Sequence, residues 1–134
     1  MKQNARLQKS HPIHDKERAW RWGQEHEACA ACWAYIGMFG VMLENHHIIK
    51  TGRSDEELNL LRLCRRCHKL AEGERIRDDE GNLLPHITLA IALTLKMESD
   101  IEHWRPKRLE ELRHSCLPNP EPIPAFFLRE RLRT

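Results

Sequence analysis

The sequence contains few residues that interrupt regular structure and little excess charge of either sign. Only 6 of its 134 residues are glycine, 40% are hydrophobic, and the formal net charge is +2. This composition favours an ordered, mainly helical chain that forms one modest domain. The small net charge excludes a strongly basic, tail-type nucleic-acid binder, although it leaves room for a local basic patch.

The chain also lacks long apolar runs. No window approaches the roughly 18 consecutive apolar residues of a membrane span. Residues 1–6 are polar, and no apolar signal-peptide core follows them. We therefore expect no membrane segment and a cytoplasmic location. Because a reducing compartment disfavours disulfides, paired thiols in such a chain are better suited to binding a metal.

Cysteine is the residue type that the chain uses in a pattern. Four of the five cysteines form two Cys-x-x-Cys pairs, Cys29 with Cys32 and Cys64 with Cys67, and Cys116 is left over. A two-residue gap places two sulfurs on one tetrahedral ion, so the pairs predict a closed zinc site with four thiolates. Residues 64–68 also fit the attachment signature of a c-type haem. That interpretation is disfavoured, because it leaves the first pair idle and no axial ligand or export signal is evident.

The region between the pairs predicts the order strand, loop, strand, helix. Met38–Leu43 is a short apolar run suited to a buried strand, and Leu58–Leu63 can return as the second strand. Residues 64–72 have the long, unbranched side chains of a helix that stops near Gly73. The 31 residues between the pairs exceed the usual zinc-finger gap of roughly 15–20. A hairpin accommodates the excess, because it leaves and returns at nearly the same place.

Outside this region we predict helices. Asp15 can cap a helix that runs toward the first cysteine pair, and Pro85 suits the first position of an apolar helix reaching about Trp104. That helix, 85–104, is apolar on both broad faces, so the zinc module or a second subunit in a homodimer must cover it. Four prolines in 118–124 predict an extended linker to a basic C-terminal end. The expected division is 1–28 as a basic segment and helix, 29–77 as the metal-bound core, 78–117 as a helical extension, and 118–134 as a linker and tail.

The combined pattern of Cys-x2-Cys, His-His-Ile and Asn-Leu-x-x-Leu-Cys-x2-Cys-His resembles the HNH endonucleases of the ββα-metal type that carry a zinc-bound scaffold. The resemblance covers Cys29 to Gly73, about a third of the chain. It implies an α+β fold in which a small ββα-metal (His-Me finger) core is flanked by N- and C-terminal helices. The tail has no counterpart in that family.

The resemblance also implies roles for individual residues. His47 would be the general base, Asn59 would orient it, and His46 and His68 would hold a catalytic divalent ion. That ion would be Mg²⁺, or another such as Mn²⁺ or Ni²⁺, separate from the Zn²⁺ of the four cysteines. A neutral imidazole with a pKa near 6.5 can accept the proton of an attacking water. The implied activity is metal-dependent nicking or cleavage of double-stranded DNA to 5′-phosphate and 3′-hydroxyl ends.

Strand geometry leaves some of these roles open. Neighbouring residues of a regular strand face opposite sides, so His46 and His47 enter one pocket only where the strand ends or bulges. Glu44 as a ligand and His46 as the base are therefore alternatives. Likewise, His68 could be a spare zinc ligand or an ordinary helix residue, and Asn59 could simply form a turn.

Basic residues around the second cysteine pair are candidate DNA contacts, although a solvated helix face explains them nearly as well. They are Lys50, Arg53, Arg62, Arg65, Arg66 and Lys69. A zinc-dependent nucleic-acid-binding module without catalysis would account for the cysteines and the basic residues, but not for the histidine doublet, Asn59 and His68 together. Compact nucleases of this kind often travel with phages or mobile elements. The resemblance therefore implies DNA as the partner, and raises a phage packaging or recombination protein as a further one.

Overall fold

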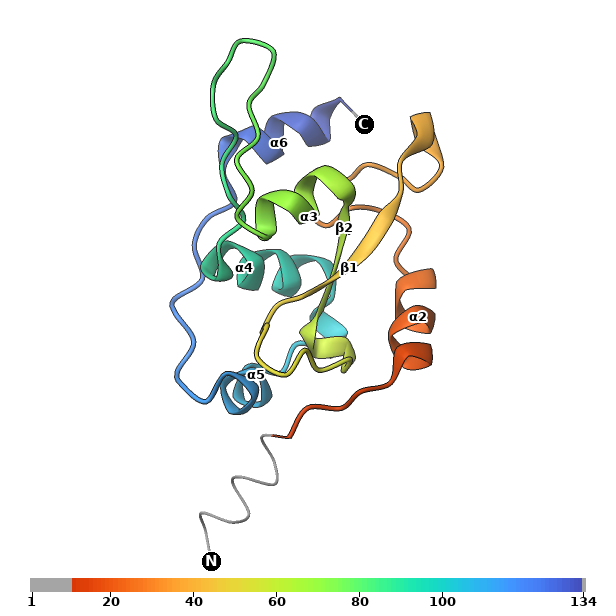
Figure 1. The fold of residues 1–134 in the computed structure, drawn as a ribbon, viewed down its shortest axis with the longest axis vertical. Helices are drawn as coiled ribbons and strands as arrows, with labels where there is room; N and C mark the ends of the chain where they lie inside the picture. Colours follow the sequence, from red (N-terminus) through yellow and green to blue (C-terminus); the bar gives the residue numbers. More distant parts are fainter. Residues whose placement is uncertain (1–10, 134) are drawn as a thin grey trace, which may run out of the picture.

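A two-stranded antiparallel sheet and the helix that follows it form the centre of the molecule (Figure 1). In this computed structural model, which describes residues 11–133, strand β1 (Leu43–His47) pairs with strand β2 (Leu60–Cys64). Helix α3 (Arg65–Ala71) begins directly after β2 and packs on both strands. The predicted order strand, loop, strand, helix is confirmed, and the fold is a small α+β arrangement.

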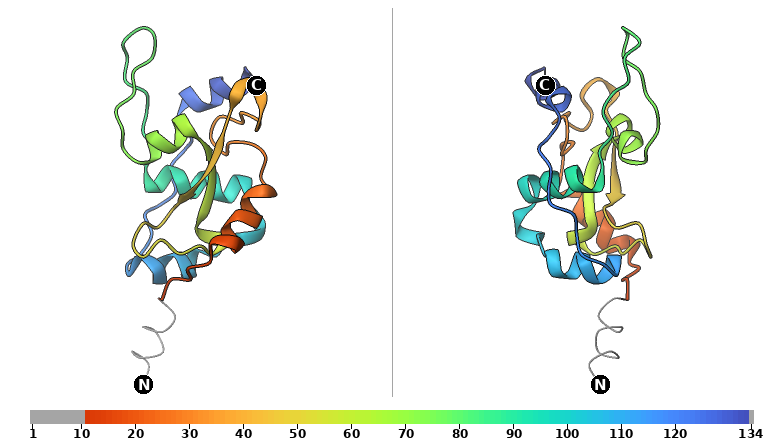
Figure 2. Two further views of the ribbon diagram at one scale, coloured as in Figure 1. Left: turned by 45° about the vertical axis from the view of Figure 1, so that its right-hand side comes forward. Right: turned by 90° about the vertical axis from the view of Figure 1, so that its left-hand side faces the viewer.

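Two further helices flank the hairpin (Figures 1 and 2). Helix α2 (Lys16–Gln24) lies against β1, and its N-cap is the predicted Asp15, whose side chain accepts a hydrogen bond from the Arg18 backbone N–H at 3.0 Å. Helix α4 (Leu89–Ser99) lies against β2. Of the predicted N-terminal segment, residues 1–10 lie outside the described range.

The predicted bounds of the apolar helix were wrong at both ends. Helix α4 begins after Thr88, whose hydroxyl accepts from the Ile91 N–H, so Pro85 lies before the helix. It ends at Ser99, and a 3-10 turn, Ile101–His103, leads to helix α5 (Pro106–Arg113), which has proline at its first turn. The side-chain hydroxyl of Thr88 supplies the cap that proline cannot offer.

Cover for α4 comes from the same chain. Leu93 and Leu95 are at most 1% exposed, and they share a hydrophobic core with β2 and with Phe127 of helix α6 (Ala125–Leu132). Lys96 is also fully buried, and its ammonium donates to the Glu57 and Leu60 carbonyls at 2.7 Å. Because α4 is tied to the start of β2 in this way, it helps to hold the hairpin in place. None of the helices within residues 11–133 combines the length and apolar character needed to cross a bilayer.

The C-terminal end, predicted as a linker and tail, closes with a helix that docks on the first cysteine pair. The proline-rich stretch is extended, but α6 follows it and buries Phe127 completely. Arg131 of α6 donates to the carbonyls of Ala30 and Ala31 at 3.0 and 2.8 Å. Residues about one hundred positions apart in the sequence therefore support the same turn.

The predicted buried strand at Met38–Leu43 is wrong. Residues Met38–Gly40 form an exposed 3-10 turn, and Phe39 at its centre is 99% exposed. Gly37 and Gly40 adopt φ values of 83° and 75°, a left-handed conformation that favours glycine and turns the chain away from the sheet. The first strand therefore starts only at Leu43.

Candidate metal centres

The two Cys-x-x-Cys pairs converge on one point. Cys29 and Cys32 lie in the turn after α2, Cys64 ends β2, and Cys67 lies in the first turn of α3. Each cysteine is at most 9% exposed, and the four sulfurs lie within 4.8 Å of one another. The sulfurs of Cys32 and Cys64 are 3.8 Å apart, which matches the edge of about 3.8 Å in a tetrahedron with metal–sulfur distances of about 2.3 Å. This thiol cluster could hold a metal such as zinc.

The thiol cluster is electrostatically prepared for a cation. Hydrogen bonding with Cys29 lowers the pKa of Cys64, and it lowers the pKa of Cys32 to about 7. The remaining protons are held more tightly, because hydrogen bonding within the cluster raises the pKa of Cys29 and Cys67. A bound zinc ion would displace those protons and satisfy all four sulfurs.

A second cluster forms where β1 meets α3. His46 comes from β1, His68 from α3, and Glu72 follows one helical turn after His68. Glu72 Oε1 lies 3.2 Å from both His46 Nδ1 and His68 Nε2. Ligands about 2.1 Å from one ion are separated by about 3.0 Å in an octahedron and about 3.4 Å in a tetrahedron. The structure brings the predicted ligands His46 and His68 together and adds Glu72. We call these three residues the His46 cluster.

The Nδ1 atom of His46 is buried without a hydrogen-bond partner among the described residues. The residue is 3% exposed, and the geometry between its Nδ1 and the nearby Glu72 carboxylate is not that of a hydrogen bond. Burial lowers the pKa of His46 to about 4, with the neighbouring His68 contributing in the same direction. At neutral pH the ring is therefore uncharged, and its buried Nδ1 is a polar atom without a partner. Such a group costs about 1–3 kcal/mol unless it finds a partner, and a cation would be one.

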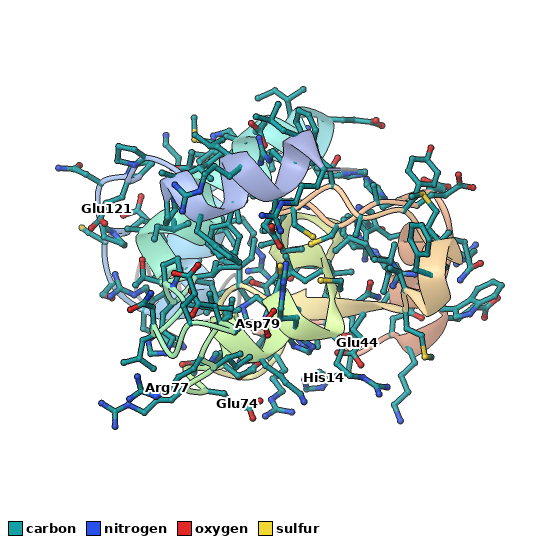
Figure 3. All side chains as sticks on the ribbon, turned by 90° about the horizontal axis from the view of Figure 1, so that it is seen from above. His14, Glu44, Glu74, Arg77, Asp79 and Glu121 are labelled. Carbon is teal, nitrogen blue, oxygen red and sulfur yellow. The ribbon has the colours of Figure 1, made fainter. Side chains whose placement is uncertain are left out.

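His68 is oriented by a carboxylate behind it. Its Nδ1 lies 2.7 Å from Glu44 Oε1, and this hydrogen bond lowers the pKa of Glu44. An ionised Glu44 places the proton on Nδ1, so Nε2 presents its lone pair to the cluster. A carboxylate that orients a metal-binding histidine is a common supporting contact. Glu44 projects from β1 near the surface (Figure 3), and this position favours a supporting role over the alternative role as a ligand.

His47 faces a different group. Its side chain is 26% exposed, and its Nε2 lies 2.9 Å from Asp55 Oδ1. The other oxygen of Asp55 accepts the backbone N–H of Asp15 at 2.9 Å, so the carboxylate is fixed between the start of α2 and the histidine. His47 is the last residue of β1 and meets Asp55 of the loop that follows, whereas His46 joins the cluster.

Asn59 acts on the loop between the strands. It is fully buried, its Oδ1 accepts from the Ile49 N–H at 2.7 Å, and its Nδ2 donates to the carbonyls of Ile49 and Ser54. The structure therefore does not join Asn59 directly to His47. Because Asp55 directly follows Ser54, whose carbonyl Asn59 binds, the effect of Asn59 on the histidine runs through the loop backbone.

The candidate DNA contacts divide by environment. Arg62 is not available to contact DNA, because it is 9% exposed and its guanidinium donates to the His26 carbonyl and to Asn45 Oδ1. Arg66 pairs with Glu130 at 2.7 Å, and Lys50 pairs with Glu72 at 2.8 Å. Arg53, Arg65 and Lys69 are exposed, and Arg65 also lies 3.5 Å from Glu44 Oε2.

The missed residues Glu72 and Asp55 carried weak sequence signals, and Glu44 was expected only as an alternative ligand. Glu72 stands four positions after His68, which is the spacing that shares a helix face. Glu44 shares a strand face with His46. Asp55 lies in a loop, where no periodicity predicts its direction.

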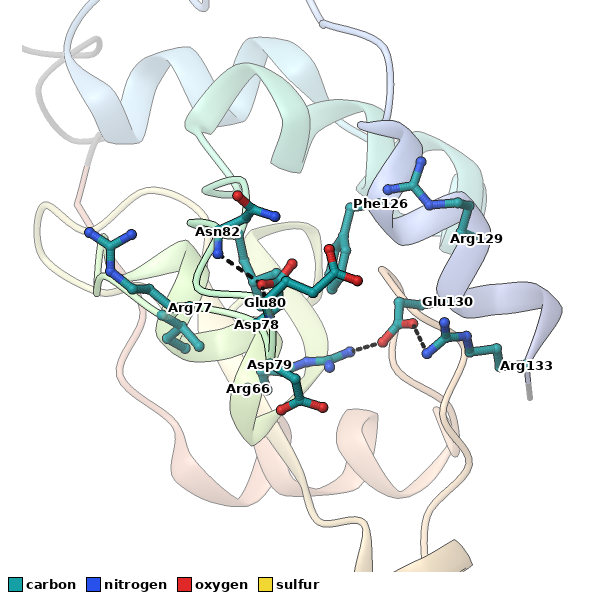
Figure 4. Close-up of a pocket in the computed structure, with 12 residues that line it drawn as sticks. Arg66, Arg77, Asp78, Asp79, Glu80, Asn82, Phe126, Arg129, Glu130 and Arg133 are labelled. Atoms are coloured by element: carbon teal, nitrogen blue, oxygen red, sulfur yellow. Dashed lines mark hydrogen bonds and ion pairs between the residues drawn. The ribbon is translucent and has the colours of Figure 1, made fainter.

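A cavity of about 580 Å³ lies between α6 and the loop at 78–82 (Figure 4). Part of its charged lining is internally paired, since Glu130 meets Arg66 at 2.7 Å and Arg133 at 3.4 Å. None of the residues that line it belongs to either cluster, so it is a weaker candidate than the His46 cluster.

Comparison with known proteins assigns no family. No family model matches the chain, and no curated protein or solved structure is significantly similar to it. The two clusters must therefore be interpreted from their own geometry.

Proposed function

We propose that this protein is a metal-dependent endonuclease of the HNH type, which hydrolyses phosphodiester bonds in DNA. The observation that carries the proposal is the His46 cluster. Three ligand atoms converge on one point, the buried His46 Nδ1 has no hydrogen-bond partner, and Glu44 holds His68 in the tautomer that a cation needs. The neighbouring thiol cluster supports the assignment, because it offers zinc a separate site.

The ligand set fits a catalytic cation better than a structural one. His46, His68 and Glu72 would hold the ion, and three protein ligands leave positions for phosphate and water. When bound, a divalent cation would neutralise the charge that develops on the phosphoryl oxygens. A site with two imidazoles and one carboxylate suits Mn²⁺, Ni²⁺ or Zn²⁺ as well as Mg²⁺.

His47 and Asp55 would supply the base. Asp55 accepts a hydrogen bond from His47 Nε2, so Nδ1 is the nitrogen that can take a proton from the attacking water. The carboxylate also stabilises the imidazolium formed by that transfer, as the aspartate does in a Ser-His-Asp triad. Of the predicted contacts, the exposed Arg53 and Lys69 would meet the phosphate backbone, whereas Arg65 lies 3.5 Å from the Glu44 carboxylate.

Plasmid nicking tests the proposal. Zinc-loaded protein with Mg²⁺ or Mn²⁺ is expected to nick supercoiled DNA, and His47→Ala is expected to reduce the rate by about 10²–10⁴-fold, the usual contribution of a general base. His86→Ala is the matched control, since this exposed histidine only contacts the Glu74 carbonyl. If the wild type binds DNA but no cation supports nicking, the protein is a zinc-dependent nucleic-acid-binding module and the proposal is wrong.

A further inference from the structure

A cavity of about 320 Å³ opens directly beside His46. It lies between the end of β1, the end of α3 and the start of α4, and Arg113 at the end of α5 completes its wall. We infer that this cavity binds the nucleotide adjacent to the scissile phosphate, with Arg113 and Lys50 contacting that nucleotide's own phosphate. The inference rests on the proposed function, because it supplies the substrate subsite of the same centre.

The charge of the lining favours an anion. Lys50 and Arg113 both line the cavity, whereas none of its lining residues is acidic. Lys50 is paired with Glu72. Arg113 donates one N–H to the Cys116 carbonyl, and a guanidinium has five. The amino end of α4 also borders the cavity, and a helix dipole favours negative charge there.

The floor and the size favour a single nucleotide. Ile48, Ile49 and Ile87 are at most 5% exposed, and they give the cavity an apolar base suited to a sugar or a nucleobase. Its volume is near the lower end of the roughly 300–1,000 Å³ of small-molecule sites. A nucleotide enters such a space only when it leaves the stack. The expected ligand is therefore an unpaired nucleotide of the cut strand.

Binding of thymidine 3′,5′-bisphosphate to the zinc-loaded protein tests the inference without catalysis. Calorimetry is expected to show saturable binding that Arg113→Gln weakens at least tenfold. Arg105→Gln is the control, because this exposed arginine donates only to backbone carbonyls near the start of α5. Arg113→Lys, which keeps the charge, is expected to retain part of the affinity and so separates charge from loss of structure. Absence of binding to the wild type, or equal binding by Arg113→Gln, overturns the inference.

An activity measurement separates this inference from the proposed function. Bis(p-nitrophenyl) phosphate has no flanking nucleotide, so Arg113→Gln should raise the KM for a single-stranded oligonucleotide about tenfold more than it raises the KM for this ester. If the variant and the wild type cleave the oligonucleotide equally well, the subsite is wrong and the nuclease assignment survives. If the wild type hydrolyses neither substrate, the nuclease assignment fails, and the subsite, as part of that centre, fails with it.

A second surface is independent of catalysis. Residues 33–42 expose six large apolar side chains and carry no charged residue. Their exposed fractions are Trp33 50%, Tyr35 50%, Ile36 46%, Met38 40%, Phe39 99% and Met42 60%. Soluble monomers rarely expose contiguous apolar patches larger than a few hundred Å². We call residues 33–42 the apolar loop.

The apolar loop lies beside the end of α6, as both Figure 1 and Figure 2 show. The Arg131 guanidinium is 4.4 Å from the centre of the Trp33 ring, and Leu132, the next residue, is 87% exposed. With about 200 Å² for each large side chain, the exposed fractions in the apolar loop amount to about 700 Å². A stable interface needs about 800 Å² per partner, so this surface approaches the size that a dimer requires.

We propose that a second copy of this chain covers the apolar loop. In a two-fold dimer the same patch meets itself, so the patch must tolerate its own charges. An uncharged apolar surface meets that condition, because no like charges are brought together. The occupant is therefore a second copy, and the interface lies at the apolar loop instead of at helix α4, which is covered within the chain.

Sedimentation equilibrium tests this proposal. The wild type is expected to be dimeric at micromolar concentration, and the double variant Phe39→Ser with Met42→Ser is expected to be monomeric and still to unfold cooperatively. Ile101→Ser removes another exposed apolar side chain, 68% exposed, and should leave the dimer intact. A monomeric wild type, or a double variant that still dimerises, contradicts the proposal.

Discussion

The thiol cluster and the His46 cluster are built on the same hairpin and helix, yet they differ in the properties that decide what a metal can do. The thiol cluster has four buried ligands of one kind, two from before β1 in the sequence and two from after it. The His46 cluster has three mixed ligands, of which Glu72 is exposed and His46 is buried. A closed site can only hold the chain together, whereas an open one leaves positions for substrate. Adjacent centres on one small scaffold can therefore serve stability and chemistry separately.

Substitution of a cysteine in the thiol cluster should have the largest effect, which is on the stability of the fold. Cys67→Ser is expected to abolish cooperative unfolding, because zinc sites of this type contribute an apparent 10–16 kcal/mol at pH 7, about the whole stability of a small domain. Circular dichroism during heating, together with zinc analysis, measures this loss. Cys116→Ser is the control, since that cysteine is exposed. A Cys67→Ser protein that unfolds cooperatively without zinc would show that the thiol cluster is not structural.

Breaking the His46 cluster should leave the fold intact. His68→Ala is expected to keep its zinc and its melting temperature within a few degrees, because the residue is partly exposed and lies outside the core. It should lose at least 10²-fold in DNA cleavage through loss of the second cation. Parallel zinc analysis, thermal unfolding and plasmid nicking check these expectations. If His68→Ala instead loses its zinc, His68 is a ligand of the zinc ion in the thiol cluster.

The free energy of unfolding should fall in acid, because His46 of the His46 cluster takes up a proton when the chain unfolds. Its pKa is about 4 in the folded protein and about 6.5 when unfolded, so the unfolded chain binds the extra proton between these values. This contribution to stability is complete above about pH 6.5 and is lost as the pH falls toward 4, by up to about 3 kcal/mol. Urea unfolding at pH 7 and pH 5, without added cation at the His46 cluster, measures the change. His46→Gln should show a smaller difference between the two pH values, and an equal difference would contradict the assignment.

Substitution of Glu44, the carboxylate that supports His68, should have the smallest effect, which is on the affinity for the cation. Glu44→Gln can no longer fix the tautomer of His68 as a carboxylate does, and contacts of this type typically change metal affinity by about 10–100-fold. Titration with Mn²⁺ should show weaker binding at unchanged zinc content. Glu27→Gln, an exposed substitution elsewhere, should bind Mn²⁺ as the wild type does. If both variants match the wild type, Glu44 does not support the site.

Local spacing made much of the centre predictable from the sequence. The Cys-x-x-Cys gaps fixed which thiols could share an ion, and the spacing between them required a hairpin. The helix after Cys64 followed from its side chains and from Gly73. His46 and His68 were also identified, because the resemblance places them on the hairpin and on the helix that follows it.

The contacts that complete the site depended on tertiary packing. Asp55 reaches His47 only because Asn59 and the cap of α2 hold the loop, and no local pattern encodes that path. The run Met38–Leu43 is apolar enough for a strand, but the glycines at 37 and 40 turn it outward. Arg62 resembles a surface cation in the sequence, whereas the hairpin directs it toward the His26 carbonyl and Asn45.

Cation binding to zinc-loaded protein tests the separation of the two clusters most directly. Mn²⁺ titration followed by electron paramagnetic resonance is expected to show one further ion bound per chain while the zinc content stays constant. Glu72→Ala should lose that ion, and Glu74→Ala, an exposed carboxylate two residues away, should keep it. A wild type that binds no ion beyond zinc, or a Glu72→Ala variant that binds Mn²⁺ as tightly as the wild type, would contradict the account.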